Sequence, residues 1–523
     1  MVASKAIEEQ IKVNRRIIGR LKREIFGVDK THRSRYIKEF NLEFKMYEAT
    51  TTAEDVIERA SRCDIVYFGD YHPLDASQDF VLRLMREFSA RGRSVVLALE
   101  MLYVHQQEFL DRWMKGTMDD AAFLEAIDYR SEWGFSWPSY RRIFDLARDP
   151  FIPVFGIDSE MRDHLRSIRR RDRLAARRIG TIRAFFPDSL ILVVVGESHL
   201  ASNHLPREVH AALARDLREI IIVQNMDDIY WSLLRKGRED AEAVAIDANR
   251  YCVFTASPML KYEAYRNIID VWVEGEEVDR HTPFLHEAID AIQSFLANGG
   301  KKRLVSLPNG RMEPFDAVLP EVQCRATYHA FSSYLRSRRV STREIVRILQ
   351  NLKRDGMSYV PSINTCLIVK FDPSIAVREA ARFVLHAARG DILERRAGPL
   401  EPEDDFLGTV IADSLVCFAS RIVDSSRDCA KYDPLIGSLE AGGAVTLDGI
   451  LRLGAKKRFL VAKALGARLG DALHTAHHEG RLTRSEIAGL FRMRLDAPGA
   501  SRDMYNELLE KTGGGVFLPL RRH

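Results

Sequence analysis

Residues 64–72 read DIVYFGDYH and residues 189–199 read SLILVVVGESH. Each stretch is a short apolar run that ends in the same form, G-[DE]-x-H. Continuous apolar runs of this length predict strands of a parallel sheet, because helices cover both faces of such a sheet. The glycine permits a sharp exit from the strand, which brings the histidine back over the strand end. The repeated form therefore predicts two strands that end at one functional edge.

Three more strands and several helices follow from the same kind of pattern. The further strands are predicted over Ser94–Glu100, Ile152–Ile157 and Glu219–Gln224. Helices are predicted over Ser77–Arg91, over Gln106–Lys115 and over an arginine-rich segment that ends near Phe185. Alternating strands and helices predict an α/β fold in which a mostly parallel central sheet has helices on both faces.

The alternation of strands and helices ends at about Tyr230, and a weak strand pattern followed by helical patterns replaces it. We predict a helical segment at 1–50, the α/β domain at 51–230, an α-rich region at 231–395 and a helical region at 396–523. The last boundary rests on Arg396–Asp405, whose two prolines and clustered acids are typical of a linker. The C-terminal half is therefore expected to be mainly helical.

Composition and charge exclude several classes of protein. The chain has 523 residues, of which 46% are hydrophobic and 29% charged, and this balance excludes collagen, bulk disorder and small disulfide scaffolds. The net charge of +4 is too small to predict nucleic-acid binding. The six cysteines are scattered without a C-x-x-C pair, which favours reduced thiols. The strongly apolar runs are far shorter than the roughly 20 residues of a membrane span, and the first residues lack a signal-peptide pattern. A cytoplasmic protein without a membrane span is expected.

The predicted edge of the sheet gathers groups that bind metals or transfer protons. Ligands of an open parallel sheet bind just beyond the carboxyl ends of its strands. The residues at those ends are Asp70, Tyr71, His72, Glu100, Asp158, Glu160, Glu197, His199 and, shortly afterwards, His204. Imidazoles and carboxylates together suit a Zn, Mn or Fe site, and a tyrosine or histidine can also ligate haem iron. Asp158 and Glu160 have an alternative role, because an acid after a strand often caps the next helix.

The same residues carry a family resemblance. The segment from about Asp64 to Gln224 resembles the ChaN-like haem-binding family, part of the superfamily that includes Tiki, TraB and erythromycin esterase proteins. The matching stretches, in the same order and spacing, are FGDYHPLDASQ (68–78), LALEM (97–101), QQEFLDRWMKG (106–116), WGFSWPSYRRIFDLAR (133–148) and VVVGESHLASNHLP (193–206). Residues 231–523 lie outside the resemblance.

The resemblance implies one pocket in which the paired histidine motifs and the intervening glutamate meet. Carried onto this chain, the pocket contains His72, Glu100 and His199, with Gln78 nearby on the helix that follows the first histidine. ChaN relatives are described as haem-binding lipoproteins linked to iron uptake, and Tiki relatives as metal-dependent proteases. This chain shows neither export nor lipid-anchor signals, so an intracellular role is expected.

Three other features are open to more than one interpretation. Nine arginines between Arg162 and Arg183 form either a solvated helix face or an anion clamp for haem propionates or phosphates. Tyr71 and Tyr140 are candidate iron or substrate contacts, although the aromatic residues around Tyr140 also suit a packed lid or loop. The sequence HTAHH at 474–478 spaces its histidines along one helix face, which permits metal binding, although no carboxylate partner is evident.

The leading hypothesis is a ChaN-like haem- or iron-binding protein that acts inside the cell. Iron would be held by His72, Tyr71 or His199, and the haem propionates by arginines. Gln78 and Tyr140 would contact the cofactor. The expected ligand is haem or another small molecule, and whether the chain forms a homo-oligomer is left open.

The alternative is an enzyme, a metal-dependent esterase or peptidase that uses the same pocket. Its Zn, Mn or Fe ion would be held by His72, Glu100, His199 and His204. Glu100 or Glu197 would act as general base on a metal-bound water, whose pKa the metal lowers to about 7. A third variant is a hydrolase that uses its histidines and glutamate without a metal.

Overall fold

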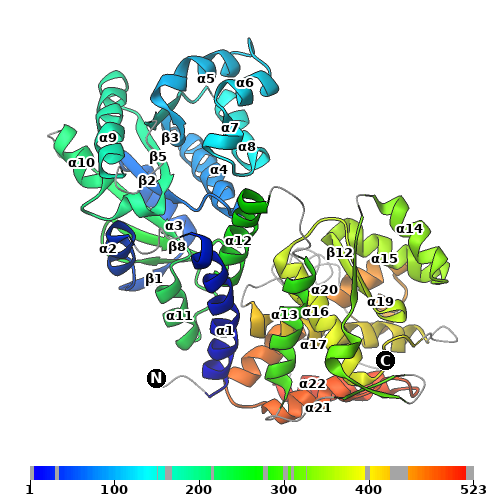
Figure 1. Ribbon diagram of the computed structural model, residues 1–523. Coiled ribbons are helices and arrows are strands. Elements are labelled where there is room, and N and C mark those ends of the chain that lie inside the picture. Colours follow the sequence, from blue (N-terminus) through cyan, green and yellow to red (C-terminus); the bar gives the residue numbers. More distant parts are fainter. Residues whose placement is uncertain are drawn as a thin grey trace. The chain divides into compact units, whose positions relative to one another are not determined.

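The computed structural model describes residues 5–29, 34–149, 151–159, 168–213, 217–274, 281–297, 304–307, 311–325, 327–394, 401–424 and 446–513. The chain divides into two compact units, which Figure 1 shows. The α/β unit comprises Arg20–Leu234 and Arg238–Glu277. The helical unit comprises Met1–Gly19, Arg235–Gly237 and Val278–His523. The finer domain boundaries predicted from the sequence stay predictions.

A mixed sheet forms the centre of the α/β unit and has eight strands within the described residues. Their order across the sheet is β1-β7-β8-β6-β2-β5-β3-β4, and only β7 is antiparallel to its neighbours. The strands are β1 (Ala49–Thr51), β2 (Ile65–Asp70), β3 (Val95–Tyr103), β4 (Val154–Asp158), β5 (Leu190–Gly196), β6 (Glu219–Gln224), β7 (Ala243–Ala245) and β8 (Arg250–Val253). The predicted α/β fold with a mostly parallel sheet is confirmed.

Helices cover both faces of this sheet (Figure 1). The layer that packs on Val66 and Phe68 contains α3 (Ala53–Ser61), α4 (Asp75–Ala90), α5 (Gln107–Met114), α6 (Asp120–Ala126) and α8 (Trp137–Arg148). The layer that packs on Ile65 and Tyr67 contains α2 (Arg35–Glu43), α9 (Ile168–Phe185), α10 (Leu205–Leu213) and α11 (Asp227–Arg235). Both sets of side chains on the central strands are buried, which explains why the apolar runs are continuous rather than alternating.

The remaining helices of this unit connect the layers or extend them. They are α7 (Tyr129–Glu132), α12 (Pro258–Glu274) and the short 3₁₀ turns η2 (Val104–Gln106) and η3 (Glu197–Leu200). The helix α1 (Lys5–Val28) contributes its first part to the helical unit and its second part to the α/β unit.

β3 departs from its predicted length in a way that affects the site. The sequence predicted a strand that ends at Glu100, but β3 continues to Tyr103, with a shift in its register against β4 between Leu99 and Tyr103. Gly156 on β4 makes room for this irregularity, because a Cβ there would lie 2.8 Å from the carbonyl oxygen of Leu102. A bulge re-aims the side chains around it, and Glu100 lies within this irregular part of the strand.

Besides the first part of α1, the helical unit contains nine helices and two small sheets in its described residues. The helices are α13 (His281–Leu296), α14 (Tyr328–Ser337), α15 (Thr342–Asp355), α16 (Pro373–Arg389), α17 (Pro402–Val423), α19 (Leu447–Leu451), α20 (Ala455–His478), α21 (Arg484–Arg492) and α22 (Ala500–Thr512). One sheet pairs β9 (Leu304–Ser306) with β10 (Met312–Pro314), and the other joins β11 (Glu321–Cys324), β13 (Thr365–Ile368) and β12 (Met357–Val360). Two short 3₁₀ turns, η4 (Phe315–Val318) and η5 (Pro361–Ile363), complete the unit.

The predicted linker over Arg396–Asp405 is helical in its second half, because α17 begins at Pro402. Residues 396–400 lie outside the described residues. A proline in the first turn followed by acidic residues is also the signature of a helix start, since proline lacks only an unused N–H there and acids favour the positive helix end. The same residue types are therefore typical of both a linker and the start of a helix, and residues 402–405 form the start of α17.

α17 is also the one helix among the described residues that is long and apolar enough to cross a membrane. Its apolar window has a mean hydropathy of 1.7, and 83% of that window is buried inside the protein. The core helix of a soluble protein passes the same test of length and composition. The sequence predicts a helix over Phe406–Asp424, but its length and apolar character were not recognised as those of a candidate span, because Asp413 and other polar residues interrupt the apolar run.

Two glycines of α20 allow it to pack closely on α17. A Cβ at Gly466 would lie 2.7 Å from the Cβ of Asp413. A Cβ at Gly470 would lie 2.6 Å from both the Cβ of Cys417 and the backbone carbonyl oxygen of Ser414. Non-bonded contacts of a Cβ atom are essentially never this short, so glycine at these two positions permits the two helices to approach each other this closely.

Replacing Gly470 by alanine is expected to lower the free energy of unfolding of the helical unit by about 1–3 kcal/mol, because the backbones must move apart. Gly489 on α21 is the matched control, since no atom lies within 4 Å of its Cβ position. Gly489→Ala should raise the stability by about 0.5–1 kcal/mol, as expected inside a helix. Urea unfolding followed by far-UV circular dichroism measures both variants, and equal losses would contradict the close-packing argument.

Candidate functional site

Asp70, the last residue of β2, organises the first histidine motif. Its buried carboxylate accepts hydrogen bonds from the Ser77 hydroxyl (2.6 Å) and the Gln78 amide (2.7 Å), both at the start of α4. It also accepts one from the Tyr140 hydroxyl on α8 (2.5 Å). Its Oδ2 atom lies 2.9 Å from Nδ1 of His72. The helices after the strand thus fix the carboxylate, and the carboxylate fixes the imidazole.

His72 is the member of this cluster that solvent reaches. Its side chain is 20% exposed, against 2% for Asp70 and 9% for Glu100. Its ring lies beside two aromatic rings, with centroid distances of 4.5 Å to Trp133 and 5.1 Å to Phe135. Nε2 lies 3.9 Å from Oε2 of Glu100, which is too long for a hydrogen bond. This nitrogen therefore keeps its capacity to bind a ligand.

Glu100 lies between the two histidine motifs, as the sequence predicted, but its oxygens are heavily engaged. Oε2 accepts a hydrogen bond from the backbone N–H of Gly196 at 2.6 Å. Oε1 contacts Arg171 at 2.5 Å and Nε2 of His199 at 3.3 Å. Burial alone would raise the pKa of Glu100, but His199 and Arg171, with a smaller effect of His72, hold its pKa well below the usual range. The carboxylate is therefore a permanent negative charge and a poor general base.

His199 belongs to a second carboxylate–histidine pair. It lies on η3 directly after β5, and its Nδ1 is 2.6 Å from Oδ1 of Asp172 on α9. The Tyr36 hydroxyl on α2 donates to the other oxygen of Asp172 at 2.6 Å. Burial opposes a charge on His199, but the carboxylates of Glu100 and Asp172 outweigh it and raise the pKa of His199 to about 10. The ring is therefore an imidazolium at neutral pH, held between two carboxylates.

Gly196 lets the two pairs approach each other. A Cβ there would lie 3.3 Å from Nε2 of His72, 3.4 Å from Oε2 of Glu100 and 3.7 Å from the ring of His199. The glycine of the G-[DE]-x-H motif thus has a second role besides permitting the sharp exit from the strand. It provides the space over which His72, Glu100 and His199 meet.

The space left on the His199 side is very small. A cavity of about 10 Å³ is lined by Glu100, Asp158, Arg171, Asp172 and His199 together with apolar side chains of the sheet and of α9 and α10. This volume corresponds to about one water molecule. No organic cofactor fits inside it.

Three predicted residues lie in other surroundings. Glu197 points to Lys261 on α12, with 3.6 Å between Oε2 and Nζ, and burial raises the pKa of Glu197. The Tyr71 ring also contacts Lys261, whose Nζ lies 4.8 Å from the ring centroid. His204 stacks on Tyr36 at 3.5 Å, and its Nδ1 lies 2.7 Å from the carbonyl oxygen of Ser198. The structure therefore does not bring Glu197, Tyr71 and His204 into the cluster of His72, Glu100 and His199.

The arginine-rich helix has a structural role that the sequence did not predict. Arg171 contacts Glu100 and also binds both oxygens of Asp158, at 2.8 and 2.9 Å. Arg183 donates to four backbone carbonyl oxygens around the start of β2 and β5. Arg162, Arg166 and Glu160 lie outside the described residues. Asp158 thus pairs with a side chain of α9, and the exposed arginines of α9 lie on the layer opposite to Trp133 and Tyr140.

Sequence reasoning missed Asp172 and Tyr36. One feature of the sequence points to Asp172. It is the single acid within the run RRRDR, and a lone acid in a basic helix suggests a buried ion pair. Nothing in the sequence points to Tyr36 as a site residue, because it lies on a helix before the first predicted strand.

The histidines of HTAHH lie on α20 in the helical unit. His474 and His478 both contact Oε1 of Gln10, at 3.1 and 2.6 Å between that oxygen and Nε2. His477 instead contacts the carbonyl oxygen of Leu482 with Nδ1 at 2.8 Å. Burial, with the neighbouring His477 and Arg421, lowers the pKa of His478 to about 3. Burial likewise lowers the pKa of His477, so these two rings are neutral at pH 7.

The fold and the site together define an α/β domain with two carboxylate–histidine pairs at the carboxyl edge of a mostly parallel sheet. Residues 56–179 match the model of the family described as haem-binding uptake, Tiki superfamily, ChaN. This match confirms the resemblance over residues 56–179, which lie within the α/β unit.

One solved structure also resembles the chain. It is described as cofacial heme binding to ChaN of Campylobacter jejuni, and it is 13% identical, with a TM-score of 0.27. The match covers 34% of this chain and 86% of that one. No curated protein matches the chain.

The raised pKa of His199 predicts how the stability of the α/β unit depends on pH. The unfolded histidine titrates near 6.5, so its contribution is complete below that pH and is lost as the pH rises through about 10. At pH 6, His199→Gln is expected to reduce the free energy of unfolding by about 3–5 kcal/mol, because two buried carboxylates lose their partner. This deficit should shrink steadily towards pH 10.

Tryptophan fluorescence measures this unit alone, because all five tryptophans of the chain lie in it. The control is His210→Gln, since His210 is exposed on α10 and forms a surface pair with Glu219. Its effect should stay below about 1 kcal/mol at every pH. A deficit in His199→Gln that is independent of pH would contradict the assigned charge.

Proposed function

We propose that the α/β unit binds haem at the carboxyl edge of its sheet and that His72 is the iron ligand. The match of residues 56–179 to a haem-binding family supports binding of this cofactor. The observation that carries the residue assignment is the pair of His72 and Asp70, with 2.9 Å between Nδ1 and Oδ2. We also propose, from the sequence alone, that the protein acts inside the cell.

The Asp70 carboxylate selects one tautomer of His72. A carboxylate without a proton can only accept, so Nδ1 of His72 carries the hydrogen and Nε2 keeps its lone pair. Metal-ligating histidines are commonly held in this way, and the carboxylate increases the basicity of the ring. His72 is therefore oriented for an iron ion before any ligand arrives.

The other predicted ligands fit haem iron less well. Both ring nitrogens of His199 face carboxylates, and its raised pKa leaves no lone pair at neutral pH. Burial raises the pKa of Tyr71 well above its ordinary value, which disfavours the phenolate that binds iron. His204 is 1% exposed and contacts Ser198 and Glu39 through its two nitrogens. Of these predicted ligands, His72 is the one whose ring solvent reaches and whose Nε2 has no hydrogen-bond partner within 3.5 Å among the described residues.

The surroundings of His72 suit a porphyrin better than a small polar substrate. Trp133 and Phe135 provide aromatic surface next to the imidazole. Porphyrin is large and apolar, and aromatic side chains bind such groups through area and ring contacts. The cavity beside His199 has only about 10 Å³, so haem would have to reach His72 from outside it.

The geometry gives the metal-dependent hydrolase no comparable support. Arg171 lies 2.5 Å from Oε1 of Glu100, where a metal ion would meet a positive charge. The Gly196 N–H takes the other oxygen, and the low pKa of Glu100 makes it a weak base. Glu197 lies with Lys261 rather than with the histidines.

Titration of the full chain with haemin, followed in the Soret region, tests the proposal. Wild-type protein should give a saturable one-to-one shift and quench tryptophan fluorescence, since Trp133 lies beside His72. His72→Ala should weaken binding by about tenfold or more, because even the outer partners of a metal-ligating histidine are worth ~10–100-fold. The control His210→Ala, an exposed histidine of the same unit, should bind as the wild type does.

Two results would overturn the assignment. The first is an absent or non-saturable shift in the wild-type protein, and the second is equal affinity in wild type and His72→Ala. If the protein instead holds stoichiometric Zn, Mn or Fe without porphyrin, and His199→Ala removes that metal, the hydrolase alternative gains the support that it now lacks.

A further inference from the structure

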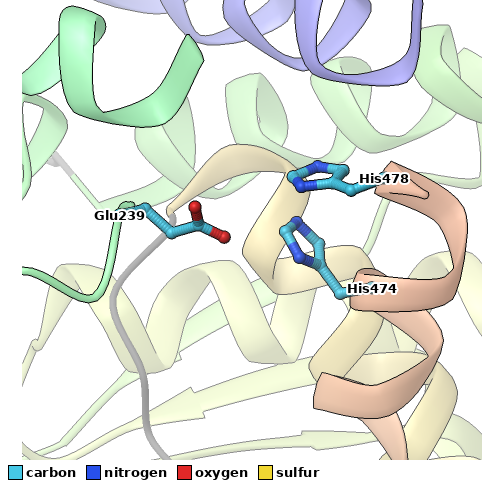
Figure 2. Close-up of side chains that lie close together, drawn as sticks. All are labelled: Glu239, His474 and His478. Atoms are coloured by element: carbon cyan, nitrogen blue, oxygen red, sulfur yellow. The ribbon is translucent and has the colours of Figure 1, made fainter. Parts of the chain in front are cut away.

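A second group of metal-ligating side chains lies in the helical unit, independent of the proposed haem site. His474 and His478 occupy positions i and i+4 of α20 and turn their rings to the same side, as Figure 2 shows. Their ring centroids are 3.9 Å apart. Glu239, which the figure also labels, belongs to the α/β unit.

Both imidazoles converge on one oxygen atom. Nε2 of His474 lies 3.1 Å from Oε1 of Gln10, and Nε2 of His478 lies 2.6 Å from the same atom. Gln10, on the first part of α1, is fully buried, and its amide nitrogen donates to the backbone carbonyl of Arg421 at 2.6 Å. That bond determines which end of the amide faces the histidines. Three atoms that can ligate a metal, two imidazole nitrogens and one amide oxygen, thus meet although they come from distant parts of the sequence.

The distances from the two imidazole nitrogens to Oε1 of Gln10 are close to those between neighbouring ligand atoms of a metal site. Zn–N bonds of 2.0–2.1 Å in a tetrahedral site separate neighbouring ligand atoms by about 3.3 Å. The contact of His474 with Gln10 already has nearly this length, and that of His478 would open by roughly 0.7 Å on the same basis. Small side-chain rotations suffice for such a change.

We propose that His474, His478 and Gln10 form a site for a divalent transition metal ion such as Zn²⁺ or Co²⁺. Histidines four residues apart on one helix are a recurring metal pair, and imidazole nitrogen selects these ions over Mg²⁺ or Ca²⁺. The metal displaces the hydrogen bonds to Gln10, each ring carries its proton on Nδ1, and water completes the coordination. The bound ion fastens the first part of α1 to the end of α20.

The surroundings tolerate a divalent cation. Arg421 lies near His478, but its guanidinium pairs with Asp471 at 2.8 Å, which offsets its charge. Arg484, near His477, is offset in the same way by Glu9 at 3.6 Å. His477 takes no part, because its ring lies against Phe295 and Phe418, at centroid distances of 5.6 and 5.9 Å, and does not face Gln10 with the other two. His474 is 1% exposed and His478 is half-buried, so a metal reaches the pair from the side of His478.

Titration of the full chain with Co²⁺ after treatment with a chelator tests this site, through the visible absorption of the bound ion. The wild type should bind one equivalent at the site, and the ion should raise its unfolding temperature. His478→Gln is the decisive variant, because its amide can still donate to Gln10 and preserve the fold while the imidazole is lost. It should weaken binding by about tenfold or more, and His474→Ala should do the same.

Two controls separate this site from others. His329→Ala removes an exposed histidine of the same unit and should leave the affinity unchanged. His72→Ala removes the proposed haem ligand and should also leave it unchanged, so failure of one proposal does not imply failure of the other. Wild-type affinity in His478→Gln, the absence of saturable Co²⁺ binding in the wild type, or a loss confined to His72→Ala would each overturn the inference.

Discussion

The buried carboxylate of Glu100 is the group on which the arrangement of the site depends. A charge removed from water is costly unless partners replace the water around it. Here the replacement comes from three directions, as a backbone N–H of Gly196, the guanidinium of Arg171 and the imidazolium of His199. Each donor comes from a different element, so β5, α9 and η3 must all be in place for the charge to be tolerated.

Arg171 extends this dependence across the sheet. It binds Glu100 on β3 and Asp158 at the end of β4, and thereby ties two neighbouring strands to α9. The next residue, Asp172, holds His199 from the other side. One turn of α9 therefore supplies a cation to one carboxylate and an anion to the histidine that faces it. This explains why an acid occurs within an otherwise basic run.

The two carboxylate–histidine pairs look alike in sequence, but their surroundings separate their roles. His199 lies between two carboxylates, which keep it charged although it is almost fully buried, and it serves to stabilise Glu100. His72 has one carboxylate at hydrogen-bond distance, an exposed edge and aromatic neighbours. The same motif thus supplies a structural cation at one strand end and an accessible imidazole at the neighbouring one.

The sequence was sufficient to predict the fold and the meeting of His72, Glu100 and His199, because continuous apolar strands define a covered parallel sheet and its carboxyl edge. It could not predict which way each side chain turns there. Glu197 and His199 are two residues apart on a 3₁₀ turn, and that turn sends one to Lys261 and the other to Asp172. Nor could it predict Tyr36, whose contact with Asp172 spans distant parts of the chain and depends on packing alone.

The histidines of HTAHH in the helical unit show the same limit of prediction. Their spacing predicts a common face of α20, but it does not predict that Gln10 packs against that face. A fully buried amide must be satisfied, and Gln10 achieves this with the nitrogen atoms that a metal would use. Hydrogen bonding and metal binding therefore compete for one pair of histidines, and the outcome depends on the ion rather than on a change of fold.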